Sequence, residues 1–113
     1  MHELSITQTI IDTVVEAAQG AAVRQITLEI GELSAILPDS IQFCFEACTP
    51  NTPLAGAKLA ILTVPGRGMC RNCGHEMPLE VPYGICDQCD SLAIDIIAGQ
   101  GLVILSMETV PCA

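Results

Sequence analysis

Two pairs of cysteines carry the clearest chemical signal in this sequence. Cys70 and Cys73 enclose Arg-Asn, Cys86 and Cys89 enclose Asp-Gln, and residues 74–85 separate the pairs. Each C-x-x-C presents two sulfurs from one tight turn, and two such turns facing each other form a tetrahedral thiolate cage. Four thiolates close the coordination shell, so such a cage serves structure and not catalysis. The spacing therefore predicts a structural metal site on these four residues.

Zinc is the metal predicted for the cage, and iron is the alternative. A rubredoxin-like iron site has the same ligands and geometry, but it relies on aromatic packing, and only Tyr83 lies nearby. Four reduced cysteines of an ordinary core are a third interpretation, which the shortage of apolar residues around them disfavours. His75 follows the first pair by two positions. It is either a neighbour of the site or a substitute ligand, and the sequence leaves both open.

The amino terminus carries a second set of metal donors. His2 is a large second residue, which generally blocks removal of the initiator methionine, so the amine of Met1 is expected to stay. That amine, the His2 amide nitrogen and the His2 imidazole can close adjacent chelate rings around one ion. A planar set of nitrogen donors suits Ni(II) or Cu(II), and intrinsic affinity favours copper. Terminal histidines are also common without any function, so the residues alone leave an inert terminus open.

Several features together resemble the HypA/HybF family of hydrogenase-maturation nickel chaperones. They are the paired cysteines, the Met-His-Glu-Leu-Ser start, the Ile-Gly-Glu-Leu segment 30–33 and the helix predicted over 38–45. The resemblance covers essentially the whole chain and keeps the order of the elements. It implies nickel bound through His2, with Glu3 in or beside the site. The nickel ligands predicted on this basis are Met1, His2 and Glu3.

The same resemblance implies a function and its partners. The protein would be a nickel metallochaperone that delivers Ni(II) during maturation of a [NiFe]-hydrogenase, with structural zinc on the four cysteines and no catalysis of its own. Its partners would be a HypB-like GTPase and the hydrogenase large subunit, and some relatives also support urease. Some relatives carry a histidine after each cysteine pair, whereas here His75 follows the first pair and Asp90-Ser91 follow the second. This departure argues against a zinc-ligand exchange that uses two histidines.

Two other function classes fit part of the pattern. A zinc-ribbon interaction module, such as a transcription-associated adaptor, would leave the N-terminus inert, and a rubredoxin-like electron carrier would hold iron. Cys44 and Cys48 lie one helical turn apart, which fits a soft-metal or redox pair, but small apolar residues on a buried helix face are the prediction. Cys112, near the C-terminus, is predicted to be an ordinary exposed thiol.

The rest of the chain alternates helical and extended patterns. Apolar residues recur at helical spacing over 3–19 and again from Pro38 to before Pro50. Strand-like alternation covers 24–33, 58–64 and 102–110. In the last of these segments, Val103, Leu105 and Met107 are expected to share one face of the strand.

These patterns predict an α+β fold. It consists of a three-stranded mixed sheet with two helices packed on one face, plus a small zinc-ribbon-like domain inserted before the last strand. Residues 66–91 have too few apolar side chains for a core of their own, so we expect the metal to hold them. The predicted domains are 1–65 with 98–113 for nickel, and 66–97 for zinc.

Charge and hydropathy exclude several other classes. The chain has 113 residues, 50% of them hydrophobic, with 4 Lys and Arg against 13 Asp and Glu and a formal net charge of −9. Such acidity repels phosphate backbones, and the near absence of aromatic residues removes stacking platforms, so no nucleic acid is expected. No basic signal peptide opens the sequence, and no apolar run approaches the roughly 20 residues of a membrane helix. We expect a cytoplasmic protein without membrane insertion, either a monomer or a weak homodimer.

Overall fold

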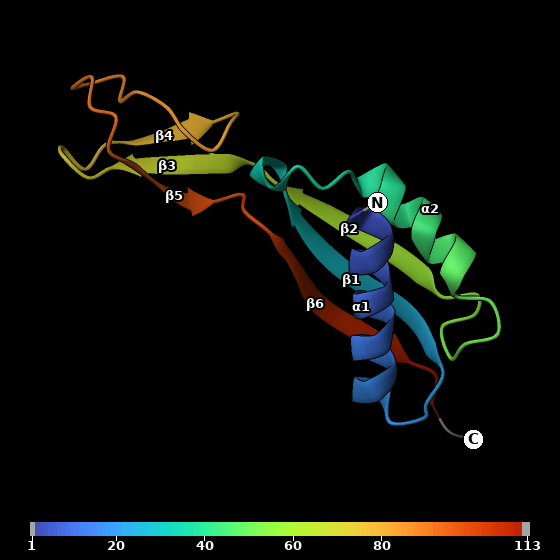
Figure 1. Cartoon of the computed structure of the whole chain (residues 1–113). Coiled ribbons are helices and arrows are strands. Elements are labelled where there is room, and N and C mark those ends of the chain that lie inside the picture. Colours follow the sequence, from blue (N-terminus) through green and yellow to red (C-terminus); the bar gives the residue numbers. More distant parts are fainter. Residues whose placement is uncertain (1, 112–113) are drawn as a thin grey trace. The chain divides into compact units, whose positions relative to one another are not determined.

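The computed structural model describes the backbone of residues 2–111 and the side chains of residues 3–111 (Figure 1). The prediction for Cys112 and the Met1 and His2 donors of the nickel prediction lie outside the described groups. Among the described residues, no helix has the length and apolar character needed to cross a membrane. In chain order the elements are α1 (His2–Ala18), β1 (Val23–Gly31), the 3-10 helix η1 (Glu32–Ser34), α2 (Pro38–Cys48), β2 (Lys58–Val64), β3 (Gly66–Cys70), β4 (Glu76–Leu79), β5 (Ile94–Ala98) and β6 (Leu102–Thr109).

The chain forms two compact units. The first comprises Met1–Glu29, Ile36–Leu62 and Val103–Ala113, and the second comprises Ile30–Ala35 and Thr63–Leu102. Each unit is built around its own three-stranded sheet, in the order β2-β1-β6 and β4-β3-β5. The predicted fold class is confirmed, since two helices accompany a mixed sheet, and a second sheet and its connecting turns carry the four-cysteine cluster.

The first sheet is mixed because a helix connects two of its strands. β1 and β2 run in the same direction, with α2 between them in the chain, and β6 runs the opposite way (Figure 1). Both helices cover the same face of this sheet (Figure 1). The core of the unit is formed by the apolar stripes of the helices and alternate strand residues: Ile10, Ile11, Val14, Val23, Ile26, Leu28, Ile41, Phe45, Leu54 and Leu59.

One predicted strand end needs correction, and one predicted strand face is exposed. β1 ends at Gly31 and not at Leu33, because the Ser34 hydroxyl donates to the Gly31 carbonyl at 2.6 Å and Ala35 turns the chain with a φ of 62°. On β6, the residues predicted to share one face, Val103, Leu105 and Met107, are not among the buried core residues. Val103 is 50% exposed and Leu105 is 47% exposed, since both helices lie on the other side of the sheet.

The second sheet contains two strands that the sequence pattern did not reveal. β3 pairs antiparallel with both β4 and β5. At position 68 in β3 a glycine stands where a strand would usually carry a side chain. No side chain fits there, because a Cβ would lie 2.6 Å from Ile94 Cγ2 and 2.7 Å from Leu79 Cδ1. Those two side chains cover the glycine, and Met77 and Leu79 of β4 are buried. The unit therefore has a small apolar core beside its cysteines, contrary to the expectation that it has none.

Candidate metal sites

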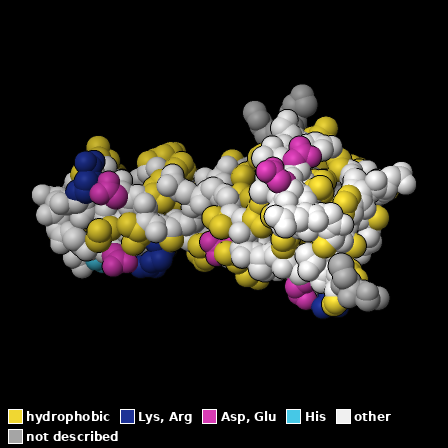
Figure 2. All heavy atoms as spheres, turned by 90° about the horizontal axis from the view of Figure 1, so that it is seen from below, with side chains coloured by type: hydrophobic (Ala, Val, Ile, Leu, Met, Phe, Trp, Pro, Cys, Tyr) yellow, Lys and Arg dark blue, Asp and Glu magenta, His cyan; other side chains and the backbone are white. Residues whose placement is uncertain are grey.

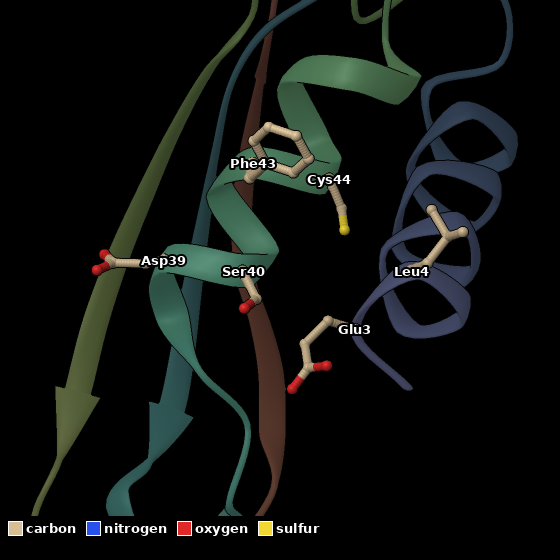
Figure 3. Close-up of a pocket in the computed structure, with 6 residues that line it drawn as sticks. All are labelled: Glu3, Leu4, Asp39, Ser40, Phe43 and Cys44. Carbon is tan, nitrogen blue, oxygen red and sulfur yellow. The ribbon is translucent and has the colours of Figure 1, made fainter. Parts of the chain in front are cut away.

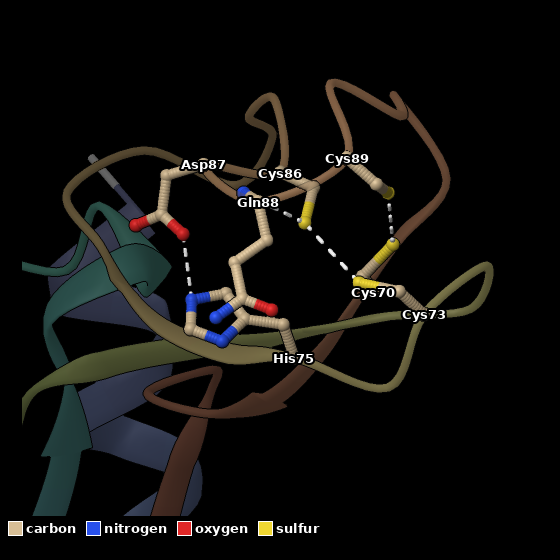
Figure 4. Close-up of polar contacts among 7 residues, drawn as sticks. All are labelled: Cys70, Cys73, His75, Cys86, Asp87, Gln88 and Cys89. Carbon is tan, nitrogen blue, oxygen red and sulfur yellow. Dashed lines mark hydrogen bonds and ion pairs between the residues drawn. The ribbon is translucent and has the colours of Figure 1, made fainter.

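The four cysteines predicted to bind metal converge at one end of the second unit (Figure 4). All four Sγ atoms lie within 4.8 Å of one another. The Cys70 and Cys89 sulfurs are 3.5 Å apart, and the Cys73 and Cys86 sulfurs are 3.6 Å apart. A regular tetrahedron with Zn–S bonds of about 2.3 Å has edges of about 3.8 Å. The arrangement thus has nearly the dimensions of a tetrahedral thiolate site.

The two cysteine pairs sit in turns of the same design. In the first, the Gly74 N–H donates to the Cys70 carbonyl at 2.8 Å, and in the second, the Asp90 N–H donates to the Cys86 carbonyl at 2.9 Å. Both of these donor residues have left-handed backbones, with φ of 79° for Gly74 and 62° for Asp90. Aspartate tolerates this conformation better than most residues do. The second turn therefore needs no glycine.

Backbone amides already point at the sulfurs. The Asn72 N–H donates to Cys70 Sγ at 3.3 Å, and the Gln88 N–H donates to Cys86 Sγ at 3.4 Å. The side-chain amide of Asn72 also donates to Cys89 Sγ at 3.4 Å. Donors of this kind stabilise thiolates, and a metal ligand must be a thiolate. The turns thus prepare the sulfurs for a cation.

The cysteine pKa values show why the cage suits a cation. Backbone hydrogen bonding at Cys73 and then at Asn72, opposed by burial, lowers the pKa of Cys70 to about 6. A backbone bond at His75 lowers the pKa of Cys73, but desolvation within the cage and the three neighbouring sulfurs outweigh it and raise that pKa to about 12. One sulfur is therefore ready as a thiolate near pH 7, while a second charge beside it is opposed. A divalent cation removes this repulsion.

His75 connects the two turns. Its Nε2 lies 2.6 Å from Oδ1 of Asp87, a residue between Cys86 and Cys89 in the sequence (Figure 4). Its carbonyl also accepts the Cys70 N–H at 2.9 Å. Of the two interpretations left open by the sequence, the geometry matches a hydrogen-bonded neighbour of the site. Among the described residues, the group with ligand spacing contains only the four cysteines.

Of the three predicted nickel ligands, Glu3 is the one whose side chain is described, and it lies in the first turn of α1. Glu3 and Leu4 line a hollow of about 330 Å³ together with residues from the start of α2, namely Asp39, Ser40, Phe43 and Cys44. In Figure 3 the Glu3 side chain extends from α1 toward the start of α2, where Ser40 lies, whereas Asp39 points away. Cys44 directs its sulfur into the space between the helices (Figure 3).

Sequence reasoning did not place α2 beside the N-terminal segment. The residues of the hollow lie far apart in the chain, and no spacing signal links them. Cys44 and Cys48 were predicted to lie on the buried face of the helix, and the structure leaves both half-buried. The Cys44 thiol is thus a soft donor close to Glu3, although no described group with metal-ligand spacing includes it.

Comparisons with known proteins match this architecture. The family model described as "Hydrogenase/urease nickel incorporation, metallochaperone, hypA" matches residues 1–109. The hydrogenase maturation factor HypA of Crocosphaera subtropica is 55% identical over 108 residues, which cover 96% of this chain and 95% of that protein. The factor of the same name from Geobacter metallireducens is 44% identical over 96% of this chain and 98% of its own length.

Solved structures agree with the sequence relatives. The solution structure of the Ni metallochaperone HypA from Helicobacter pylori has a TM-score of 0.68 and 25% identity, and covers 96% of this chain and 97% of that chain. A second solution structure, of HypA protein, has a TM-score of 0.71 and 27% identity, with 97% of each chain covered.

Proposed function

Because the chain belongs to the HypA family of nickel metallochaperones for hydrogenase maturation, we propose that it binds Ni(II) at Met1, His2 and Glu3 and delivers it to the large subunit of a [NiFe]-hydrogenase. The family consists of metallochaperones and not of enzymes. Nickel is the cargo in this proposal, and the cysteine cage holds a structural zinc ion. A HypB-like GTPase supplies the nucleotide hydrolysis that this chain does not perform.

The placement of Glu3 is the observation that carries the nickel proposal. Its carboxylate faces the start of α2 and borders the same hollow as the Cys44 thiol. Nickel held by the terminal amine, the His2 amide and the imidazole would thus lie next to an oxygen donor and a soft sulfur donor. Nitrogen, oxygen and sulfur are all ligands for this ion, so the surroundings suit nickel in transit.

Ligand exchange follows from the same placement. Donors on the first residues of a helix impose less geometry than a closed cage, so a partner can replace them one at a time. Each donor must also lose a proton to bind, which weakens the site as the pH falls. The proposed nickel site is therefore suited to transfer, and the proposed zinc site to retention.

Zinc suits the second unit because of the donor set. Four sulfurs at tetrahedral spacing, with N–H donors already placed, match a closed thiolate site. We assign nickel binding to residues 1–65 with 98–113 and zinc binding to residues 66–97. Elemental analysis identifies the bound metal directly. Colour is a second test, because an iron protein with this ligand set is red and a zinc protein is colourless.

The decisive experiment adds one glycine before Met1. The extra residue moves the terminal amine out of the chelate, so specific nickel binding should weaken at least about tenfold, or 1.4 kcal/mol. Isothermal titration of parent and extended protein measures the loss, and zinc content serves as the control for folding. If the extended protein binds nickel like the parent, the terminal amine is not a ligand and the proposed site is wrong.

We also propose that the protein works in the cytoplasm as a monomer or weak homodimer. A formal net charge of −9 opposes close association of identical chains and favours partners with basic surfaces. Sedimentation of the zinc-loaded protein at several concentrations tests the oligomeric state.

A further inference from the structure

Four large apolar side chains lie exposed on the second unit. Val81 is 44% exposed, Tyr83 72%, Ile85 58% and Leu92 76%. With Gly84 they line a hollow of about 630 Å³, and these four side chains are called the apolar patch below. Hydrophobic side chains lie open on the surface of this unit in the space-filling view, where the unit is at the left (Figure 2). Clustered exposure of this kind marks interaction sites in soluble proteins.

The metal cage holds the apolar patch in place. The patch belongs to the segment 80–93, which links β4 to β5 and contains the second cysteine pair. The Cys86 N–H donates to the Ser91 carbonyl at 2.8 Å, which closes the loop between Ile85 and Leu92. Cys86 itself is fully buried. The second cysteine turn therefore preorganises the part of the patch formed by Ile85 and Leu92, and preorganised surfaces lose less entropy on binding.

The chain segment that carries the apolar patch is acidic. The segment 80–93 contains Glu80, Asp87 and Asp90 and no Lys or Arg, and no Lys or Arg follows Arg71 in the sequence. The arginines of the second unit lie against other carboxylates. Arg71 Nε is 3.2 Å from Asp95 Oδ1, and Arg67 lies 3.9 Å from Glu76. An apolar surface on an acidic segment is complementary to an apolar group flanked by cations.

We propose that the apolar patch docks a partner-protein segment that presents aliphatic or aromatic side chains between lysines or arginines. A second copy of this chain fits poorly, because two acidic segments would meet across the interface, and each chain carries a formal net charge of −9. An anionic membrane surface would be repelled for the same reason. The docking surface lies entirely in the second unit, so it is independent of nickel binding at the N-terminus.

Two synthetic peptides test the proposal on the full-length zinc-loaded protein. They carry the same leucine and phenylalanine residues, flanked by lysine in one and by glutamate in the other. Titration followed by ¹⁵N NMR should show shifts concentrated in residues 80–93, with the lysine peptide binding at least about tenfold more tightly. Added salt should reduce the difference in affinity between the two peptides, because it screens the charges.

Three variants locate the contact. Leu92→Ser should weaken binding of the lysine peptide at least about fivefold, whereas Leu62→Ser should leave the affinity for this peptide unchanged. Leu62 is a matched control because it is an apolar side chain, 53% exposed, on β2 of the first unit. Glu80→Lys should weaken binding of the lysine peptide and strengthen binding of the glutamate peptide. Zinc content of each variant shows that the cage is intact.

Four results would overturn the proposal. They are equal affinity for both peptides, shifts outside the second unit, no binding of the lysine peptide up to about 1 mM, and an equal loss in Leu62→Ser. A concentration-dependent dimer that Leu92→Ser abolishes would make a second copy the occupant instead.

Discussion

Replacing Cys73 with alanine should unfold the second unit and leave the first unit folded. Cys73 is the exposed member of the cage, so alanine creates no large cavity in an apolar core. It removes one of four sulfurs and leaves a site that a water molecule or another donor must complete. We therefore expect zinc to be released and the segment around β3, β4 and β5 to lose its order.

The expected size of the effect follows from what else holds the second unit together. Its described large buried apolar side chains are Ile30, Met77 and Leu79. At about 1.5–3 kcal/mol each, they stabilise the unit by roughly 5–9 kcal/mol. Structural zinc contributes about 10–16 kcal/mol in small zinc domains at pH 7. Because zinc supplies the larger share, its loss exceeds what the apolar side chains can replace.

The chain offers a separate optical probe for each unit. Tyr83 is the only tyrosine and there is no tryptophan, so near-UV and fluorescence signals of tyrosine report on the second unit. Helices α1 and α2 belong to the first unit, so ellipticity at about 222 nm reports mainly on that unit. Cys48→Ala is the matched control, since it removes a half-buried cysteine outside the cage.

We expect Cys73→Ala to change the tyrosine signal to that of an unfolded chain and to retain most of the helical ellipticity. Cys48→Ala should keep zinc and both signals. Collapse of the helical signal together with the tyrosine signal would refute the reasoning, because it would show that the two units fold as one. Zinc retention near the parent level would show that the cage does not need Cys73.

Three further predictions concern the nickel site and the backbone of the second unit. His2→Ala should abolish specific nickel binding with unchanged zinc content and helical ellipticity; nickel uptake at the parent level would exclude the imidazole as a ligand. On acidification from pH 8 to 5, nickel should leave before zinc. The terminal amine and imidazole have reference pKa values of about 7.7–8.0 and 6.5, and both bind only when deprotonated. Zinc is held by four thiolates in a closed shell, so protons displace it less readily. Parallel measurement of both metals tests this order, and zinc leaving first would reverse the site assignment. Gly31→Ala should destabilise the second unit by roughly 2–6 kcal/mol, because a Cβ at Gly31 would lie 2.0 Å from the Gly99 oxygen and would displace the Gly31–Gly101 and Leu33–Gly99 hydrogen bonds, both 2.8 Å. Gly101→Ala is the control, since it has open space around it and only the strain of a φ of 73°, and an equal loss in urea unfolding of both variants would contradict the steric argument.

The sequence predicted the elements whose signals are local. Helical spacing identified α1 and α2, and alternation identified β1, β2 and β6 to within a residue or two at most ends. Strand β3 escaped detection because Gly66 and Gly68 stand where strand side chains would show a pattern. Strand β4 has only four residues, too few to show alternation, and one of them is Pro78. Tertiary packing makes those glycines necessary, since a Cβ on Gly68 would collide with side chains from β4 and from the start of β5.

In the candidate sites too, the sequence predicted the donors that lie close together in the chain. The cysteine spacing by itself determined a four-sulfur site, because each pair is one turn of local backbone and a tetrahedral ion needs two such turns. The Met-His-Glu start likewise determined a possible chelate within adjacent residues. The family resemblance, and not the chemistry of the donors, selected nickel over copper.

Only the tertiary structure decided what surrounds these donors. It placed Ser40 and Cys44 beside Glu3, joined His75 to Asp87, and left Leu92 exposed on a surface shaped by the cage. None of these relations leaves a signal in the sequence, because they join residues whose separation along the chain follows no fixed period. Local patterns determine which side chains a turn or a helix presents, whereas packing between elements determines which of them meet.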